Sequence, residues 1–293
     1  MNPQTITRQQ NRSLAGDSAR ERLLRDLPVT SRTLTLAGID TPVVEGGKGP
    51  PVILLHGPAG HALHWLRVIP LLVSSHRVIA PDLPGHGASE VKEGSLDPSQ
   101  VIRWLDELIT ATCTAPPVVL AQVLGGAIAL RYAADHGDRI ERLVLVDTMG
   151  LAPFEPSPEF GAALHRFLSQ PTKETQQLLW QQCAYDLEIL QTSMGDSWAP
   201  FDAYNLDRAT APGVLPMVMN LMERFAMSAM PPKELERITT PTTLVWGRHN
   251  RAIPLKVAET ASARYGWPLV IIEDSGVDAP LDQPEAVAKV VTA

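Results

Sequence analysis

The chain lacks several features that would place it in a specialised class of protein. Only two cysteines, Cys113 and Cys183, occur among its 293 residues, far apart and outside any Cys-x-x-Cys pattern. This scarcity argues against a disulfide framework or a structural zinc site. No apolar run approaches the roughly 20 residues of a membrane-spanning helix, and the polar N-terminus has no apolar segment of a secretory signal peptide. We therefore expect a soluble, cytoplasmic protein.

An excess of positive charge and the common cofactor motifs are also missing. The formal net charge is -7, which gives no electrostatic reason to expect nucleic acid or an anionic membrane as a partner. There is no P-loop and no His-Glu-x-x-His, and Leu124-Gly125-Gly126 lacks the Gly-x-Gly-x-x-Gly spacing. We expect neither a metal nor another cofactor, and the sequence does not indicate an oligomeric state.

What is present fits one α/β domain with an insertion. Hydrophobic residues make up 44% of the chain and charged residues 19%, which is ordinary for a globular protein of this length. A hairpin-like pair spans 31–47, and short apolar runs typical of buried strands follow at 51–57, 77–83, 118–122, 143–148, 242–247 and 269–274. Helical patterns at 99–111, 124–136, 255–265 and 284–292 separate most of these runs. This alternation predicts a mostly parallel sheet with helices on both faces.

The alternation is interrupted once, between Asp147 and Pro241. This stretch has helical patterns near 157–169, 171–192, 200–209 and 212–229, and no good strand. We predict an all-helical cap at 149–233, inserted after the sixth strand into a core formed by 29–148 and 234–293. Residues 1–28 are expected to form a polar extension with one short helix. The methionines of the cap either line an adaptable apolar pocket or fill the packing between cap and core.

Five landmarks follow one another along the chain. They are HGPAG at 56–60, PDLPGHGAS at 81–89, AQVLGG at 121–126, PTTLVWGRHN at 241–250 and DSGVDAPLDQPEAV at 274–287. Together, over roughly residues 30–293, they resemble the capped α/β-hydrolase family. The resemblance implies the α/β-hydrolase fold, in which 118–130 forms a strand, a tight turn and a helix that expose a nucleophile at the turn.

The residues expected at the family's catalytic positions cannot perform its usual chemistry. The nucleophile of Gly-x-Ser-x-Gly falls on Val123, which has no oxygen or sulfur. The acid after the seventh strand falls on Asn250, and the catalytic histidine falls on Val277. One oxyanion N–H of the family would come from Leu124. The other N–H of the family comes from the residue after the His-Gly pair, here His56 and Gly57. That residue is Pro58, which has no N–H.

Two other residues are candidates for catalysis. Asp147 ends the sixth strand, at the carboxyl edge where α/β active sites form. It is either a general base or ligand contact, or it caps its own loop through the N–H groups of Thr148 and Met149. His61 follows the HGPAG loop and either reaches the mouth of the pocket or lies in solvent, while His64 packs beside Trp65.

Three further residues are candidates for the pocket. Gln122 either hydrogen-bonds a ligand carbonyl or, as we favour, ties the elbow to a neighbouring strand. Asp278 either points inward as a desolvated base or, as we favour, faces solvent. His249, with its flanking arginines Arg248 and Arg251, either binds an anionic ligand group or pairs with carboxylates; the candidates for this pairing, which we favour, are Asp278, Asp282 and Asp82.

Valine in place of serine and histidine leaves an apolar pocket floor, which suits a small apolar or aromatic ligand. We therefore expect first a cofactor-independent, non-hydrolytic enzyme: a lyase, isomerase or cyclase in which Asp147 or His61 moves a proton. The second hypothesis is a pseudoenzyme that only binds its ligand. The third is an unorthodox hydrolase in which a carboxylate activates water.

Overall fold

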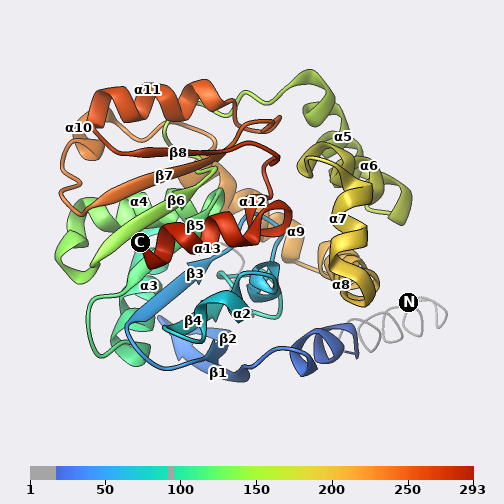
Figure 1. The fold of residues 1–293 in the computed structure, drawn as a ribbon, viewed down its shortest axis with the longest axis horizontal. Helices are drawn as coiled ribbons and strands as arrows, with labels where there is room; N and C mark the ends of the chain where they lie inside the picture. Colours follow the sequence, from blue (N-terminus) through green and yellow to red (C-terminus); the bar gives the residue numbers. More distant parts are fainter. Residues whose placement is uncertain (1–17, 92–95) are drawn as a thin grey trace.

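The computed structural model describes residues 18–91 and 96–293. A single eight-stranded sheet has the order β1-β2-β4-β3-β5-β6-β7-β8 (Figure 1). The pairs β1–β2 and β2–β4 are antiparallel and all others are parallel, which confirms the predicted sheet. The strands are β1 (Thr30–Leu36), β2 (Ile39–Gly46), β3 (Pro51–Leu55), β4 (Arg77–Pro81), β5 (Val118–Gln122), β6 (Arg142–Val146), β7 (Thr242–Gly247) and β8 (Leu269–Ile272).

The sheet is buried on both faces because its central strands are largely apolar. Successive side chains of a strand point to opposite faces. In β3, Ile53 and Leu55 join the hydrophobic core on one face, while Val52 and Leu54 join the core on the other. A continuous apolar run is what a parallel strand between two helical layers requires.

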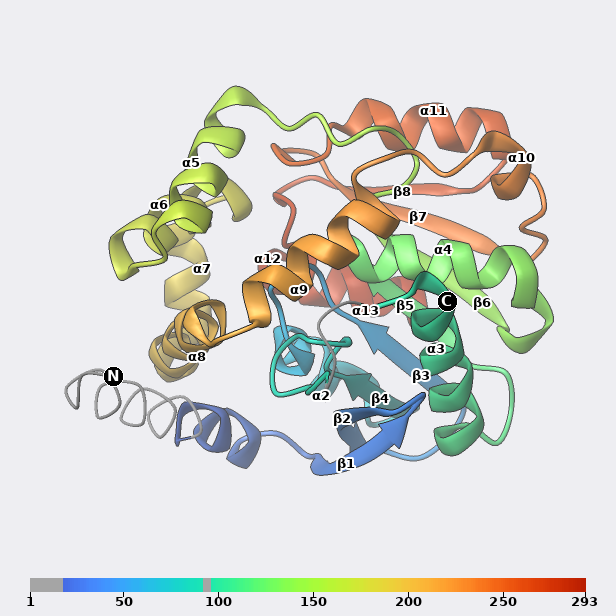
Figure 2. The same ribbon diagram turned by 180° about the vertical axis from the view of Figure 1, so that it is seen from behind.

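Helices cover the two faces, with α2, α12 and α13 on one side and α3 and α4 on the other (Figures 1 and 2). Outside the β6–β7 segment the helices are η1 (Ala62–Trp65), α2 (Ile69–Leu72), α3 (Pro98–Thr112), α4 (Leu124–His136), η2 (Gly137–Arg139), α11 (Leu255–Tyr265), α12 (Ala279–Asp282) and α13 (Pro284–Thr292). Residues 18–25 are helical as well, within the predicted extension 1–28, of which residues 1–17 lie outside the described residues. Within the described ranges, no helix combines the length and apolarity needed to cross a membrane.

The segment between β6 and β7 is helical, as predicted, and its first helices, within residues 158–210, gather at one end of the sheet (Figure 2). It contains α5 (Pro158–Ser169), α6 (Lys173–Cys183), α7 (Leu187–Met194), η3 (Gly195–Ser197), α8 (Trp198–Thr210), α9 (Val214–Leu221), the π-helical η4 (Met222–Ala226) and α10 (Pro232–Leu235). We call residues 158–226 the helical insertion. The helical pattern at 171–192 is broken at Ala184, whose backbone is extended, and Asp186 begins a new helix by accepting from the N–H groups of Glu188 and Ile189.

The helical insertion is joined to the core at the loop after β8. The N–H of Val277 donates to the carbonyl of Cys183 over 2.9 Å. Gly276 lies so close that a Cβ there would come within 2.1 Å of the same carbonyl. This glycine therefore lets the end of α6 rest directly on the loop that carries Val277 and Asp278.

Candidate functional site

The predicted strand, turn and helix at 118–130 is confirmed, and Val123 occupies the turn. Its backbone has φ 47 and ψ -104, between the end of β5 and the start of α4. A positive φ is a genuine outlier for a β-branched residue, and such strain typically amounts to about 1–3 kcal/mol. The turn is held from both sides, because the N–H of Val123 donates to Val146 and its carbonyl accepts from Ala127 and Met149.

The loop after β3 lies against this turn. A Cβ added to Gly57 would be 3.6 Å from the Cβ of Val123. His56 braces the loop as expected: its Nε2 accepts from the N–H of Leu83 over 2.9 Å, and its Nδ1 lies 2.7 Å from the carbonyl of Gly57. The next residue, Pro58, has no N–H to offer to a ligand, while Leu124 opens α4 as a fully buried residue.

Asp147 and Asn250 connect the ends of β6 and β7. Asp147 Oδ1 accepts from Asn250 Nδ2 over 2.7 Å and from the N–H of Gly247 over 3.0 Å. Asn250 Oδ1 accepts in turn from the N–H groups of Ala252 and Ile253. Burial raises the pKa of Asp147 well above its usual range, and among the described residues nothing hydrogen-bonds its Oδ2. The predicted capping of Thr148 and Met149 is wrong, since Met149 N–H donates to Val123.

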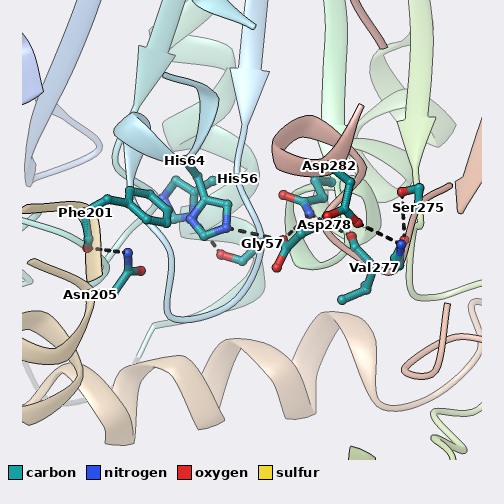
Figure 3. A network of polar contacts seen from close by, with 11 residues as sticks. His56, Gly57, His64, Phe201, Asn205, Ser275, Val277, Asp278 and Asp282 are labelled. Carbon is teal, nitrogen blue, oxygen red and sulfur yellow. Dashed lines mark hydrogen bonds and ion pairs between the residues drawn. The ribbon is translucent and has the colours of Figure 1, made fainter. Parts of the chain in front are cut away.

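Asp278 is buried, with an exposed fraction of 7%, so the solvent-facing position that we favoured is wrong (Figure 3). Its Oδ1 accepts from Gln122 Nε2 over 2.9 Å, and the same amide nitrogen donates to the carbonyl of Val277 over 3.0 Å. Gln122 thus ties the elbow to the loop after β8, which is not the adjacent strand that the sequence suggested. This loop is far from Gln122 in the sequence, but the fold places it at the carboxyl end of β5.

His64 completes this cluster from η1. Its Nε2 lies 3.3 Å from Asp278 Oδ1, and both side chains are almost entirely shielded from solvent. The ring stacks on Trp180 of α6 and lies near Phe201 of α8, with ring centroids 6.2 and 5.3 Å apart. Sequence reasoning placed His64 only beside Trp65 and missed this pair, because the two partners are 214 positions apart and no local pattern marks them.

His61 is enclosed and not solvated. It is only 1% exposed and lies against Tyr204 and Phe201 of α8, with ring centroids 4.5 and 5.6 Å away. Burial lowers the pKa of His61 well below its usual range, and the nearby His64 adds to this. Within the described part of the chain neither ring nitrogen has a hydrogen-bond partner. The ring is therefore a neutral imidazole with one donor and one acceptor available.

The charged residues after β7 do not pair as predicted. Arg248 forms its ion pair with Glu273, and Arg251 donates to the carbonyls of Gln181 and Ala184 in the helical insertion. The ring of His249 lies 4.9 Å from that of Tyr185. These side chains fasten the loop after β7 to its neighbours, and none of these contacts involves Asp278, Asp282 or Asp82.

A cavity of about 120 Å³ with a mostly apolar lining lies between the loop after β6 and the start of α11. Its walls include Met149, Phe154, Ile253 and Val257. The N–H of Met149 also donates to the carbonyl of Val123, so one residue of the cavity wall is hydrogen-bonded to the elbow.

Known proteins resemble most of the chain or a part of it. It is 26% identical over 266 residues, 88% of each chain, to the 2-hydroxy-6-oxo-6-(2'-aminophenyl)hexa-2,4-dienoic acid hydrolase of Metapseudomonas resinovorans. It is 34% identical over 139 residues to the haloalkane dehalogenase of Mycobacterium marinum, which covers 44% of this chain and 47% of that protein.

Solved structures agree with this fold. A membrane phospholipase A, described as a novel bacterial virulence factor, superposes with a TM-score of 0.80 at 25% identity, covering 96% of this chain and 90% of that one. The 2-hydroxy-6-oxo-6-phenylhexa-2,4-dienoate hydrolase of Rhodococcus sp. strain RHA1 gives 0.78 at 24% identity, covering 90% and 97%. The model of the alpha/beta hydrolase family matches residues 52–290. The chain therefore belongs to the alpha/beta hydrolase family.

Proposed function

We propose that this chain is a cofactor-independent enzyme that does not hydrolyse its substrate. It would act as a lyase, isomerase or cyclase on a small, largely apolar molecule held between the helical insertion and the core. The observation that carries the proposal is Val123 at the tip of the elbow. An alkyl side chain cannot attack a carbonyl, and in a serine hydrolase loss of the nucleophile or base lowers kcat on the order of 10⁶-fold.

The other positions that the family resemblance singles out support the same proposal. Val277 would replace the base, and Asn250 would replace the acid. Asn250 already donates to Asp147 and accepts from two backbone N–H groups, so its amide is committed to the loop. With Pro58 in the oxyanion loop, one of two donors is missing as well, which typically lowers kcat about 10²–10³-fold.

Two buried groups are proposed to move protons in place of the triad. His61 is neutral and has both nitrogens available within the described residues, as a general acid–base group requires. Asp147 has a raised pKa and an unpaired Oδ2 among those residues. Because its other oxygen braces the strand ends, we assign the larger part to His61.

The ligand is proposed to be apolar or aromatic. His61 and His64 face the rings of Trp180, Phe201 and Tyr204 in the helical insertion, and such a lining favours planar, poorly hydrated molecules. The Metapseudomonas relative is named for a substrate that bears an aminophenyl group, which agrees with this class of ligand.

A carboxylate-activated water, the third hypothesis from the sequence, is the alternative that a specific observation favours, because the named relatives are hydrolases and Asp147 keeps one free oxygen among the described residues. To separate the two, the purified protein is incubated with a small-molecule extract of its host in ¹⁸O-labelled water and compared by mass spectrometry with heat-killed protein. We expect a metabolite to be consumed without uptake of ¹⁸O. A product that carries ¹⁸O would establish the hydrolase, and a metabolite retained intact would establish a binder.

The catalytic assignment is tested on the metabolite found in this way. We expect His61→Gln to lower kcat by about 10²–10⁴-fold, the usual contribution of a general acid–base group, with the thermal unfolding midpoint recorded as a control for folding. Asp147→Asn keeps an oxygen for Gly247 and Asn250 and should have a smaller effect. Full activity in both variants would remove both residues from the mechanism.

A further inference from the structure

Asp278 is held in place from two sides by buried groups. Its Oδ1 lies 2.9 Å from Gln122 Nε2 and 3.3 Å from His64 Nε2, and Gln122 Nε2 also donates to the carbonyl of Val277. Figure 3 shows His64, Val277 and Asp278. These three side chains come from β5, η1 and the loop before α12. The cluster is therefore part of the fixed architecture at the carboxyl edge of the sheet.

The carboxylate determines which nitrogen of His64 carries the proton. A carboxylate oxygen accepts hydrogen bonds, so the facing Nε2 of a neutral ring is the N–H and Nδ1 keeps the lone pair. That Nδ1 is buried and has no partner among the described residues, and the same holds for Gln122 Oε1. A buried polar atom is stabilised by a hydrogen-bond partner, so these two atoms are available to a bound molecule.

An imidazole oriented by a carboxylate, with its second nitrogen free, is the arrangement that makes histidine a general base. His61 lies beside it, with ring centroids 5.9 Å apart, and Phe201 of the helical insertion contacts both rings. A neutral imidazole can donate a hydrogen bond to a carbonyl oxygen on which charge develops. The two rings therefore provide a base and a hydrogen-bond donor side by side, and both contact Phe201.

We propose that His64, held by Asp278 and Gln122, is the base of a proton shift in a small, apolar, unsaturated carbonyl compound, with His61 as the hydrogen-bond donor to the carbonyl oxygen. This inference rests on the proposed function and narrows it to an isomerase. It assigns the proton transfer to His64, and His61, which was given the larger part above, then acts by polarising the carbonyl group. Asp278 and Gln122 are positioning residues, because they act on the substrate only through His64.

The step balances without a nucleophile, water or cofactor. His64 Nδ1 takes a proton from the carbon next to the carbonyl, and the electrons of that C–H bond move into a C=C bond and onto the carbonyl oxygen. His61 N–H stabilises this enolate oxygen. The imidazolium of His64 then returns the proton to the far end of the conjugated system, which forms a new C–H bond and regenerates both histidines.

The test uses the full chain with two probes, a β,γ-unsaturated cyclohexenone and the host extract, both in D₂O. We expect conversion to the conjugated ketone, or a metabolite converted to its isomer, with the transferred hydrogen retained as protium because His64 is shielded from solvent. His64→Gln should lower either conversion by about 10²–10⁴-fold. His86→Gln is the matched control, because His86 is also buried but bonds to the carbonyl of Pro84 in another loop, and it should keep full turnover.

The positioning role of Asp278 has its own readout. In ¹H–¹⁵N spectra of the imidazoles, His64 should carry its proton on Nε2 in the wild type and show a mixture of tautomers in Asp278→Asn, while Asp278→Glu should restore the wild-type state in part. Because these spectra need no substrate, they also keep the inference testable in variants that fold but do not turn over. A wild-type His64 protonated on Nδ1 would overturn it.

The outcomes separate this inference from the proposed function. If the extract is converted without ¹⁸O uptake and His64→Gln turns over as fast as the wild type, the non-hydrolytic enzyme stands and the His64–Asp278 base is wrong. If neither probe is isomerised by the wild type, the proton shift is wrong. Products that contain ¹⁸O would overturn both.

Discussion

Val123 has a positive φ, a backbone conformation that β-branched residues seldom adopt. The conformation is imposed by the surroundings: the hydrogen bonds to Val146, Ala127 and Met149 hold the turn whatever side chain it carries. Identity and geometry are therefore separable at this residue. The elbow forms here with valine at its tip.

Because of this separation, restoring a serine should not restore hydrolysis. We expect Val123→Ser to hydrolyse a nitrophenyl ester no faster than the wild type, because a triad acts as a unit and neither Val277 nor Asn250 can activate the hydroxyl. Release of nitrophenolate is followed by absorbance, with Val123→Ala as the control for loss of the branched side chain. A burst of product in Val123→Ser alone would show that another base reaches position 123.

At the scale of elements, the elbow depends on how closely α4 approaches β3. A Cβ on Gly125 would come within 2.6 Å of the carbonyl oxygen of Leu55 and 2.7 Å of that of His56, both backbone atoms. In contrast, a Cβ on Gly161 in α5 would meet only Pro156, at 3.8 Å. The same substitution should therefore have opposite effects in the two helices.

We expect Gly125→Ala to lower the free energy of unfolding by about 1–3 kcal/mol, since overpacking forces the backbone to move. Gly161→Ala should raise it by about 0.5–1 kcal/mol, because alanine is the better helix former in an uncrowded position. Urea unfolding of both variants measures the two signs. Equal effects would mean that α4 does not rest on β3 as described.

At the scale of the whole molecule, Asp282 joins the helical insertion to the core. Its Oδ2 accepts from the N–H of Gly276 over 2.8 Å and from that of Tyr185 over 3.0 Å. Burial, together with the charge of Asp278, raises the pKa of Asp282 to about 7. The pKa of an aspartate in an unfolded chain is about 3.9. At pH values between these two pKa values, the native state therefore keeps a proton on Asp282 that the unfolded state has released.

Stability should therefore fall as the pH rises through this window and level off above it. We expect Asp282→Asn, which keeps an oxygen for both N–H groups, to be more stable relative to the wild type at pH 8 than at pH 5. The difference between the two pH values should be on the order of 1.4 kcal/mol for each pH unit between pH 5 and the native pKa of about 7. Urea unfolding at both pH values measures it, with the exposed Asp196→Asn as control. A variant with the pH dependence of the wild type would contradict the raised pKa.

Local patterns were enough to predict the strands, the elbow and the helical insertion. They failed where one segment depends on a distant one. The pattern at 171–192 does not show that the helix must end before Ala184, where the loop after β8 lies against the end of α6. Likewise, Asp278 was expected in solvent because nothing near it in the chain is a partner. Its partners, Gln122 and His64, reach it only through the fold.

The sequence by itself determined the fold family and the absence of a nucleophile at position 123, because strand runs, turn glycines and residue identity are local properties. Only the tertiary structure decided where the polar chemistry lies. In the folded chain His61 packs against α8, and Asp278 contacts His64 and Gln122. Asn250 donates a hydrogen bond to Asp147. Such pairs form between segments far apart in the chain, and burial sets their charge states, so no local pattern records them.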